Sequence, residues 1–178
     1  MLNKKQPALM SLIFLVMLYP SLLQAQCAGG NSNAAVPASA PLSDFAEQED
    51  GTLRHQRTGL IWQRCALGQS WDGSGCTGIE MQLNWNSALN AADSHIQADQ
   101  ADWRLPNRNE LASIIEQHCF GPALDSDAFP SAPVTAYWSS TPVSGAGEQV
   151  WSIDFVDGIV LPASTETLQA VRLVRGRF

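Results

Sequence analysis

Four cysteines, at positions 27, 65, 76 and 119, are the residues of this chain with the clearest chemistry. Four cysteines allow three disulfide connectivities. Cys65 and Cys76 flank a polar, glycine-rich loop, and a bond between them would close that loop and contribute about 3 kcal/mol. Cys27 and Cys119 would then form a long-range bond that holds the N-terminal segment to the rest of the chain. A zinc site is the alternative, but there is no Cys-x-x-Cys spacing and the three histidines are scattered, so two disulfides are predicted.

The loop between Cys65 and Cys76 also carries the first candidate for ligand binding. Trp71 and Asp72 stand beside Gly73-Ser74-Gly75, in a stretch polar enough to face solvent. A rigid loop that presents one aromatic ring and one carboxylate can contact a sugar or a protein. The alternative is that Trp71 folds back onto the core, as we expect of the other five of the six tryptophans, because aromatic side chains dominate the cores of small domains.

Three arginines near the C-terminus form the second candidate, for a sulfated or carboxylated ligand. They are Arg172, Arg175 and Arg177. Arginine suits such anions because its guanidinium group can donate two parallel hydrogen bonds to them. The alternative is that these arginines neutralise local carboxylates such as Asp154 or Asp157.

Motifs for metal binding and catalysis are weak. Asp125-Ser126-Asp127 resembles the start of a calcium loop but lacks the glycine and the closing glutamate, so a turn or a helix cap is predicted there. The chain has neither a Gly-x-Ser-x-Gly nor a His-Glu-x-x-His motif. We therefore predict no catalytic residue, no metal site and no cofactor, and calcium is the alternative for a cofactor. A carboxylate pair acting on envelope glycans is the enzymatic alternative.

The first 25 residues have the parts of a cleavable secretory leader. Lys4 and Lys5 precede an apolar stretch over residues 8–18, and Ala25 supplies a small residue for cleavage before Gln26. The alternatives are a membrane anchor that is never cut and a lipid attached to Cys27. Neither is favoured, because the apolar stretch is too short to span a bilayer and Gln26 stands where a lipid-attachment site needs a small residue. The protein is therefore predicted to be exported to the periplasm, the cell surface or the medium.

Removal of this leader changes the charge balance. It removes both lysines and leaves eight arginines against seventeen acidic residues, so the formal net charge moves from −7 to −9. Nucleic acids and anionic membrane surfaces attract basic patches. Both partners are therefore disfavoured, as is stable membrane insertion after cleavage, and a glycan or an envelope or surface protein is the expected partner.

The elements that must position these residues form an α+β pattern. Residues 26–43 are rich in Gly, Ala, Ser, Asn and Pro and are predicted to be a flexible tether, with one domain over residues 44–178. One helix is expected over residues 85–92, and a second begins after Asn107, with Glu110 completing a capping box and His118 on its apolar face. Strands are predicted at residues 52–55, 60–64, 136–140, 150–156, 159–161 and 170–175. The last of these alternates Val171 and Leu173 with Arg172, which places Arg172 opposite the buried face.

Much of the chain resembles the Lcl C-terminal domain family, which is named for the C-terminal domain of the Legionella collagen-like adhesin. The segments that carry the resemblance are Asp50–Thr52, Arg57–Cys65, Trp71–Gly73, Asp102–Asn107, Glu110-Leu111, Phe129-Pro130, Tyr137–Thr141 and Val171–Gly176. The resemblance implies a C-type-lectin-like fold, with two helices packed on small antiparallel sheets and long loops between them. It also implies a trimer that binds sulfated glycans. This chain departs from both properties, because it has no Gly-x-y stalk to support a trimer and its acidic charge opposes sulfated ligands.

Taken together, the residues and the resemblance predict an exported, non-enzymatic binding domain. It would contact a glycan or a protein through its loops, as an adhesin does. A structural or accessory component of a periplasmic or cell-surface assembly is the alternative.

Overall fold

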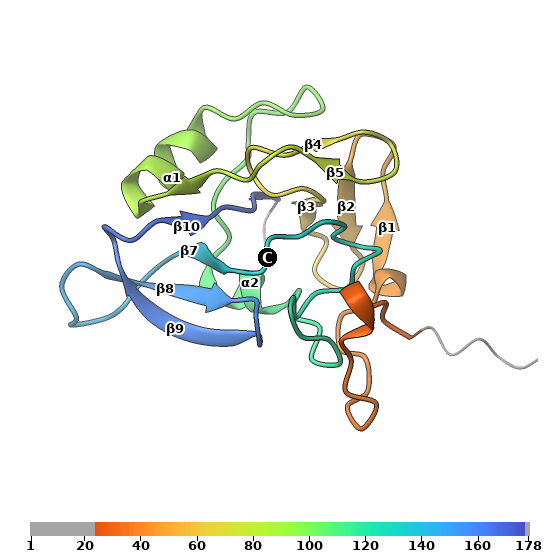
Figure 1. The fold of residues 1–178 in the computed structure, drawn as a ribbon. Helices are drawn as coiled ribbons and strands as arrows, with labels where there is room; N and C mark the ends of the chain where they lie inside the picture. Colours follow the sequence, from red (N-terminus) through yellow and green to blue (C-terminus); the bar gives the residue numbers. More distant parts are fainter. Residues whose placement is uncertain (1–23, 177–178) are drawn as a thin grey trace, which may run out of the picture.

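Two sheets and two α-helices form the body of the protein, which the computed structural model describes over residues 24–176 (Figure 1). All but the last two residues of the predicted leader lie outside the described part. The first sheet has the strand order β1-β2-β3-β11 and the second has the order β6-β10-β7-β8-β9, while β4 and β5 form a separate hairpin. The strands are β1 Phe45–Glu47, β2 Thr52–His55, β3 Ile61–Gln63, β4 Ser70–Trp71, β5 Cys76–Thr77, β6 Gln82–Leu83, β7 Ala136–Pro142, β8 Gln149–Asp154, β9 Ile159–Ser164, β10 Gln169–Ala170 and β11 Val174–Arg175.

The predicted α+β class is confirmed, and so are the local hairpins. Strands β2 and β3 pair antiparallel, as do β8 and β9, whose register places Asp154 opposite Ile159 across the Asp157-Gly158 turn. Gly158 adopts a φ of +72° in this turn, which a glycine accepts without strain. The five-stranded sheet also has one parallel pair, β10 with β7, so it is mixed rather than purely antiparallel.

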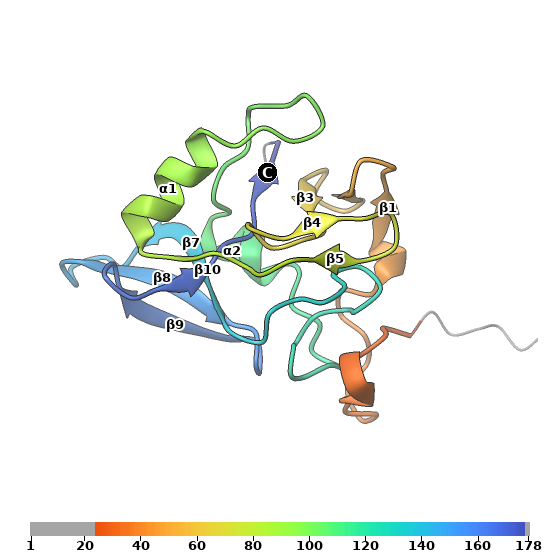
Figure 2. The ribbon, with the colours of Figure 1, turned by 45° about the horizontal axis from the view of Figure 1, so that its top comes forward.

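The single strand predicted over residues 170–175 is wrong. The segment forms two short strands, β10 and β11, which belong to different sheets, and Figure 2 shows it crossing between them. Every residue from Ala170 to Val174 is buried. Because both faces of the segment are covered, the alternation of side chains does not separate a buried face from an exposed one.

The two helices begin where the sequence predicts. Helix α1 (Trp85–Asp93) starts at Asn84, whose side chain accepts a hydrogen bond from the Ser87 backbone N–H. Helix α2 (Arg108–Ala112) has the predicted capping box between Asn107 and Glu110, but it is only five residues long. His118 therefore lies in the following loop, where its ring Nδ1 is 2.8 Å from the carbonyl oxygen of Val36. No helix within residues 24–176 has the length and apolarity to cross a membrane.

The core consists of two clusters of apolar side chains. One lies between the two larger sheets and α2, and it includes Trp62, Leu111 and Ile153. The other lies under α1 and includes Trp103 and Trp138. Of the five tryptophans predicted to pack in the core, these three are buried, whereas Trp85 and Trp151 are partly exposed.

The N-terminal segment differs from the predicted flexible tether. Cys27 is bonded to Cys119, as predicted. The buried carboxylate of Glu116 accepts hydrogen bonds from the backbone N–H groups of Ser39 and Ala40, the second at 2.8 Å. Ala40 itself is buried. Residues 26–43 therefore belong to the folded body, because acidic side chains far along the chain bind their backbone, a partnership that local composition does not reveal.

Candidate functional site

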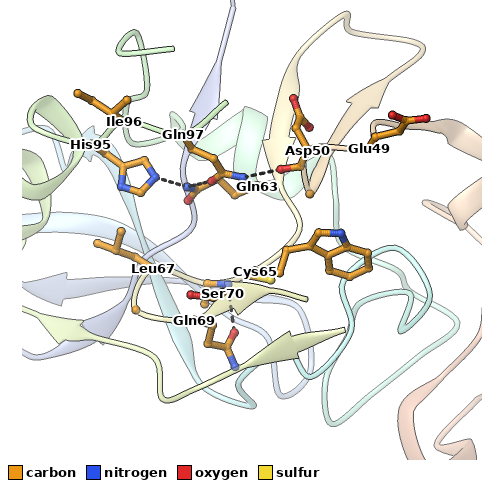
Figure 3. Close-up of a pocket in the computed structure, with 14 residues that line it drawn as sticks. Glu49, Asp50, Gln63, Cys65, Leu67, Gln69, Ser70, His95, Ile96 and Gln97 are labelled. Atoms are coloured by element: carbon orange, nitrogen blue, oxygen red, sulfur yellow. Dashed lines mark hydrogen bonds between the residues drawn. The ribbon is translucent and has the colours of Figure 1, made fainter. Parts of the chain in front are cut away.

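A cleft of about 420 Å³ opens between the disulfide-closed loop and the segment after α1, as Figure 3 shows. The second disulfide, Cys65 with Cys76, closes this loop as predicted. The turn between β1 and β2 forms a third wall. The lining residues are Glu49, Asp50, Gly51, Gln63, Cys65, Ala66, Leu67, Gly68, Gln69, Ser70, Trp71, His95, Ile96 and Gln97.

A row of polar side chains is fixed along one wall of the cleft. The side-chain amide nitrogen of Gln63 donates to Oε1 of Gln97 at 2.6 Å and lies 2.6 Å from Nε2 of His95. The side-chain oxygen of Gln63 is used separately, because it accepts from the backbone N–H of Leu173 at 3.3 Å. The Gln63 amide must therefore donate to His95 Nε2, so the neutral imidazole carries its proton on Nδ1.

Two further contacts, one to the backbone and one between rings, hold Gln97 and His95 in this wall. Gln97 donates from its side-chain amide to the carbonyl oxygen of Asp50 at 3.3 Å, which joins the loop after α1 to the turn between β1 and β2. The His95 ring stands edge-on to the buried Trp103, with 6.3 Å between ring centroids. These contacts hold the row in place along a preformed hollow, which is the usual architecture of a small-ligand site.

Trp71 lies at the rim of the cleft and is neither buried nor fully exposed. It belongs to β4, which pairs with β5 inside the disulfide loop. The guanidinium carbon of Arg64 lies 4.2 Å from the Trp71 ring centroid, a cation–π contact. Gly51 also packs against this residue, because a Cβ added to Gly51 would come within 2.7 Å of the Trp71 Cβ. The ring is thus positioned by its neighbours rather than free in solvent.

A second hollow, of about 350 Å³, also borders Trp71. Glu47 and Arg64 line it, and their side chains form an ion pair at 2.7 Å. The Arg64 guanidinium also donates to the backbone carbonyls of Asp127 and Ala128. Because Arg64 is buried and already paired, this hollow has no unpaired arginine for an anion.

Asp72, which was predicted to bind ligand with Trp71, stabilises its own turn. Its Oδ1 accepts hydrogen bonds from the Ser74 backbone N–H at 2.9 Å, the Ser74 hydroxyl at 2.9 Å and the Gly75 N–H at 2.8 Å. These bonds, the backbone ones foremost, hold the pKa of Asp72 below its usual value. Asp72 is exposed, but the residues that line the two hollows are others.

The structure corrects the prediction for Arg172. The side chain is only 1% exposed, and its Nη1 donates to the backbone carbonyls of Gln63 and Arg64. Its guanidinium carbon lies 4.6 Å from the ring centroid of Phe129 and 5.7 Å from that of Tyr137. Burial lowers the pKa of Arg172. A guanidinium group enclosed in this way cannot reach a ligand, and it serves the core instead.

Arg175 does lie near the surface, but its partner differs from those predicted. Its Nε is 2.8 Å from Oδ1 of Asp102, and its Nη2 donates to the side-chain oxygen of Gln100 at 2.8 Å. Arg175 therefore neutralises a carboxylate, as the alternative predicted, but the carboxylate is that of Asp102 rather than Asp154 or Asp157. Arg177 lies outside the described residues. Of the four described residues that were predicted to bind a ligand, only Trp71 lines the cleft.

Four residues of the cleft were not predicted from the sequence: Glu49, Gln63, His95 and Gln97. They come from three separate segments that meet only in the fold. His95 is one of three histidines scattered along the sequence, and no motif spacing links it to Gln63. Within residues 24–176, no group of three or more His, Cys, Asp or Glu side chains is arranged to hold a metal ion.

The predicted turn at Asp125 is confirmed. Its Oδ1 accepts hydrogen bonds from the backbone N–H groups of Asp127 at 2.9 Å and Ala128 at 3.1 Å. This is the geometry of an aspartate that caps a turn.

Comparison with known proteins bears on the identity of the chain. A search of curated proteins gave no match. A family model described as the Lcl C-terminal domain matches residues 51–175. The matched stretch includes both larger sheets, both helices and the cleft, apart from β1 and its turn. The chain therefore belongs to the Lcl C-terminal domain family.

Proposed function

We propose that this protein is an exported, non-enzymatic binding domain that contacts a glycan through the cleft beside Trp71. The observation that carries the proposal is the combination of a partly exposed indole ring with a fixed row of amide and imidazole groups in one preformed hollow. A sugar ring has an apolar C–H face that packs on an aromatic side chain and hydroxyl groups that bond to amides and carboxylates. Membership of a family named for an adhesin domain supports the same role.

The charges of the cleft favour a neutral glycan over a sulfated one. Glu49 and Asp50 are among its lining residues, which include no lysine or arginine. Sulfate groups are bound by arginine clusters, and two arginines outside the cleft, Arg64 and Arg175, are already paired with Glu47 and Asp102. The sulfated glycans implied by the family resemblance are therefore not the expected ligands of this cleft.

Export is supported by the cysteine chemistry. The two disulfides join all four cysteines of the chain. Such bonds persist in oxidising compartments and are rare in a reducing cytoplasm. Together with the leader-like N-terminus, they support delivery to the periplasm, the cell surface or the medium.

A glycan-array screen of the exported, oxidised protein tests this function. We expect neutral glycans to bind, and Trp71→Ala to weaken binding about fivefold or more, if a sugar face packs on the ring as strongly as a nucleic-acid base, whose stacking contributes on the order of 1–3 kcal/mol. Trp151→Ala is the matched control, because it removes a partly exposed tryptophan from β8, outside the cleft. Absence of glycan binding, or equal loss in both variants, would refute the proposal.

The edge strand β9 favours the alternative of an accessory component. Three consecutive apolar residues of this strand are exposed: Ile159 by 50%, Val160 by 36% and Leu161 by 44%. An exposed apolar edge strand can pair with a strand of another protein. Absence of glycan binding, together with co-purification of an envelope protein that Leu161→Lys abolishes, would favour this function.

A further inference from the structure

The backbone nitrogen of Gln26 lies 3.2 Å from Oδ2 of Asp125, on a carboxylate that is only 1% exposed. The same oxygen accepts from the Leu42 backbone N–H at 2.9 Å. The other oxygen of this carboxylate accepts from the Asp127 and Ala128 N–H groups. Asp125 thus joins both ends of the N-terminal segment to the core, and Gln26 is the residue that would begin the chain after cleavage following Ala25.

Two contacts that do not involve the residues before Gln26 hold its backbone in place. The Gln26 carbonyl oxygen accepts hydrogen bonds from the Ser126 backbone N–H at 2.7 Å and from its hydroxyl at 3.1 Å. The next residue, Cys27, is bonded to Cys119. Both contacts remain when the leader is removed, so the nitrogen stays beside Asp125.

We propose that cleavage after Ala25 turns the Gln26 nitrogen into an α-ammonium group that forms an ion pair with the buried carboxylate of Asp125. The inference rests on the export part of the proposed function. Before cleavage this contact is a neutral amide hydrogen bond; afterwards it is charge-assisted and stronger. Because Gln26 is exposed, the remaining hydrogens of the ammonium stay hydrated, which limits the cost of burying the charge. Processing thereby strengthens the fold of the mature chain.

The order of events follows from the burial of the neighbouring residue. Ala25 is 4% exposed, so the peptide bond between Ala25 and Gln26 is covered once this segment has docked. A protease must therefore cut before the segment folds onto the domain, and the ion pair forms only afterwards.

The ion pair has a chemical consequence that can be measured. A free N-terminal glutamine cyclises when its neutral amine attacks the side-chain amide carbon. A new bond forms between the α-nitrogen and Cδ, the bond between Cδ and Nε2 breaks, and the nitrogen leaves as ammonia after proton transfer from the amine. An amine held as an ammonium by Asp125 has no lone pair for this attack, so the folded protein should keep its open glutamine.

Mass spectrometry of the purified, exported protein tests the proposal. The intact mass should show a chain that begins at Gln26, and incubation in neutral buffer should remove little ammonia from its N-terminal peptide. Asp125→Asn should cyclise about tenfold faster or more, the ratio expected when one charge-assisted bond is lost. Glu116→Gln is the matched control, because Glu116 is a second buried carboxylate that binds the same segment at Ser39 and Ala40 but not at Gln26.

Three results would overturn the proposal. Equal acceleration in Asp125→Asn and Glu116→Gln would show that general loosening of the segment, rather than the ion pair, controls cyclisation. Complete cyclisation of the wild-type protein would show that the amine is free. A chain that begins at another residue would refute the cleavage site. None of these results affects glycan binding, so failure of the proposed binding function remains distinguishable.

Discussion

Removal of each disulfide in turn should produce two different effects, one on global stability and one on the cleft. Cys27 and Cys119 are 92 residues apart, whereas Cys65 and Cys76 are 11 apart. The entropy lost by the unfolded chain on loop closure corresponds to about 4.6 kcal/mol for a separation of 92 and about 2.8 kcal/mol for 11. Cys27→Ser/Cys119→Ser should therefore lower the free energy of unfolding by about 2 kcal/mol more than Cys65→Ser/Cys76→Ser.

The effect of each disulfide on the order of its own segment should have the opposite ranking. The N-terminal segment keeps its hydrogen bonds to Glu116 and Asp125 when the long-range disulfide is absent. Besides its disulfide, the hairpin that carries Trp71 has two residue pairs between β4 and β5, the hydrogen bonds of the Asp72 turn and the cation–π contact with Arg64, all of which are weaker than a covalent bond. Loss of the short-range disulfide should therefore release Trp71, although it costs less stability.

Urea unfolding and hydrogen exchange measure the two effects separately. Unfolding of the oxidised variants gives the free energies, and exchange at the backbone amides of residues 66–75 reports the order of the disulfide loop. We expect faster exchange there only in Cys65→Ser/Cys76→Ser. Equal losses of stability, or the reverse order, would refute the loop-length reasoning. Unchanged exchange in this loop would refute the role of its disulfide in holding Trp71.

Three further perturbations test the packing described above. Burial, assisted by the charge of Arg57, holds the pKa of His55 below its usual value. The unfolded chain therefore binds more protons than the folded one, and the urea midpoint should fall as the pH drops below about 6.5. This fall should be smaller in His55→Gln. Gly51→Ala should destabilise the protein and shift tryptophan fluorescence, because φ is +77° and the new Cβ would lie 2.7 Å from that of Trp71. Arg172→Ala should cost about 3 kcal/mol or more in urea unfolding, through a cavity and two unpaired carbonyls, and Arg172→Met should cost less.

The parts of the fold that were predicted correctly depend on neighbouring residues. The capping box uses Asn107 and Glu110, three residues apart, and the β8–β9 hairpin follows from the Asp157-Gly158 turn. Burial would raise the pKa of Glu110, but the hydrogen bonds from Arg104 and the Asn107 N–H outweigh it and hold that pKa low. Arg104 is outside the capping box, and its part in this contact is visible only in the structure.

The parts that were predicted incorrectly depend on partners far along the chain. Composition indicated a tether before residue 44, but Glu116 and Asp125 bind that segment from more than 70 residues away. The cleft is similar, because Gln63 and His95 are 32 residues apart and meet only after β3 and α1 have packed. Trp71 was found because its disulfide loop is a local feature.

Arg172 shows how an incorrect surface assignment still bears on the candidate site. Its guanidinium group binds the carbonyl of Gln63 from inside the core, and the backbone N–H of Leu173, the next residue, binds the side-chain oxygen of Gln63. The buried segment between β10 and β11 therefore sets both the backbone and the side chain of the residue that orients His95 and Gln97. Arg172 cannot reach a ligand, but it holds the cleft residue Gln63 from the core side. Substitution of Arg172 should therefore alter ligand binding through Gln63 without removing any contact to the ligand itself.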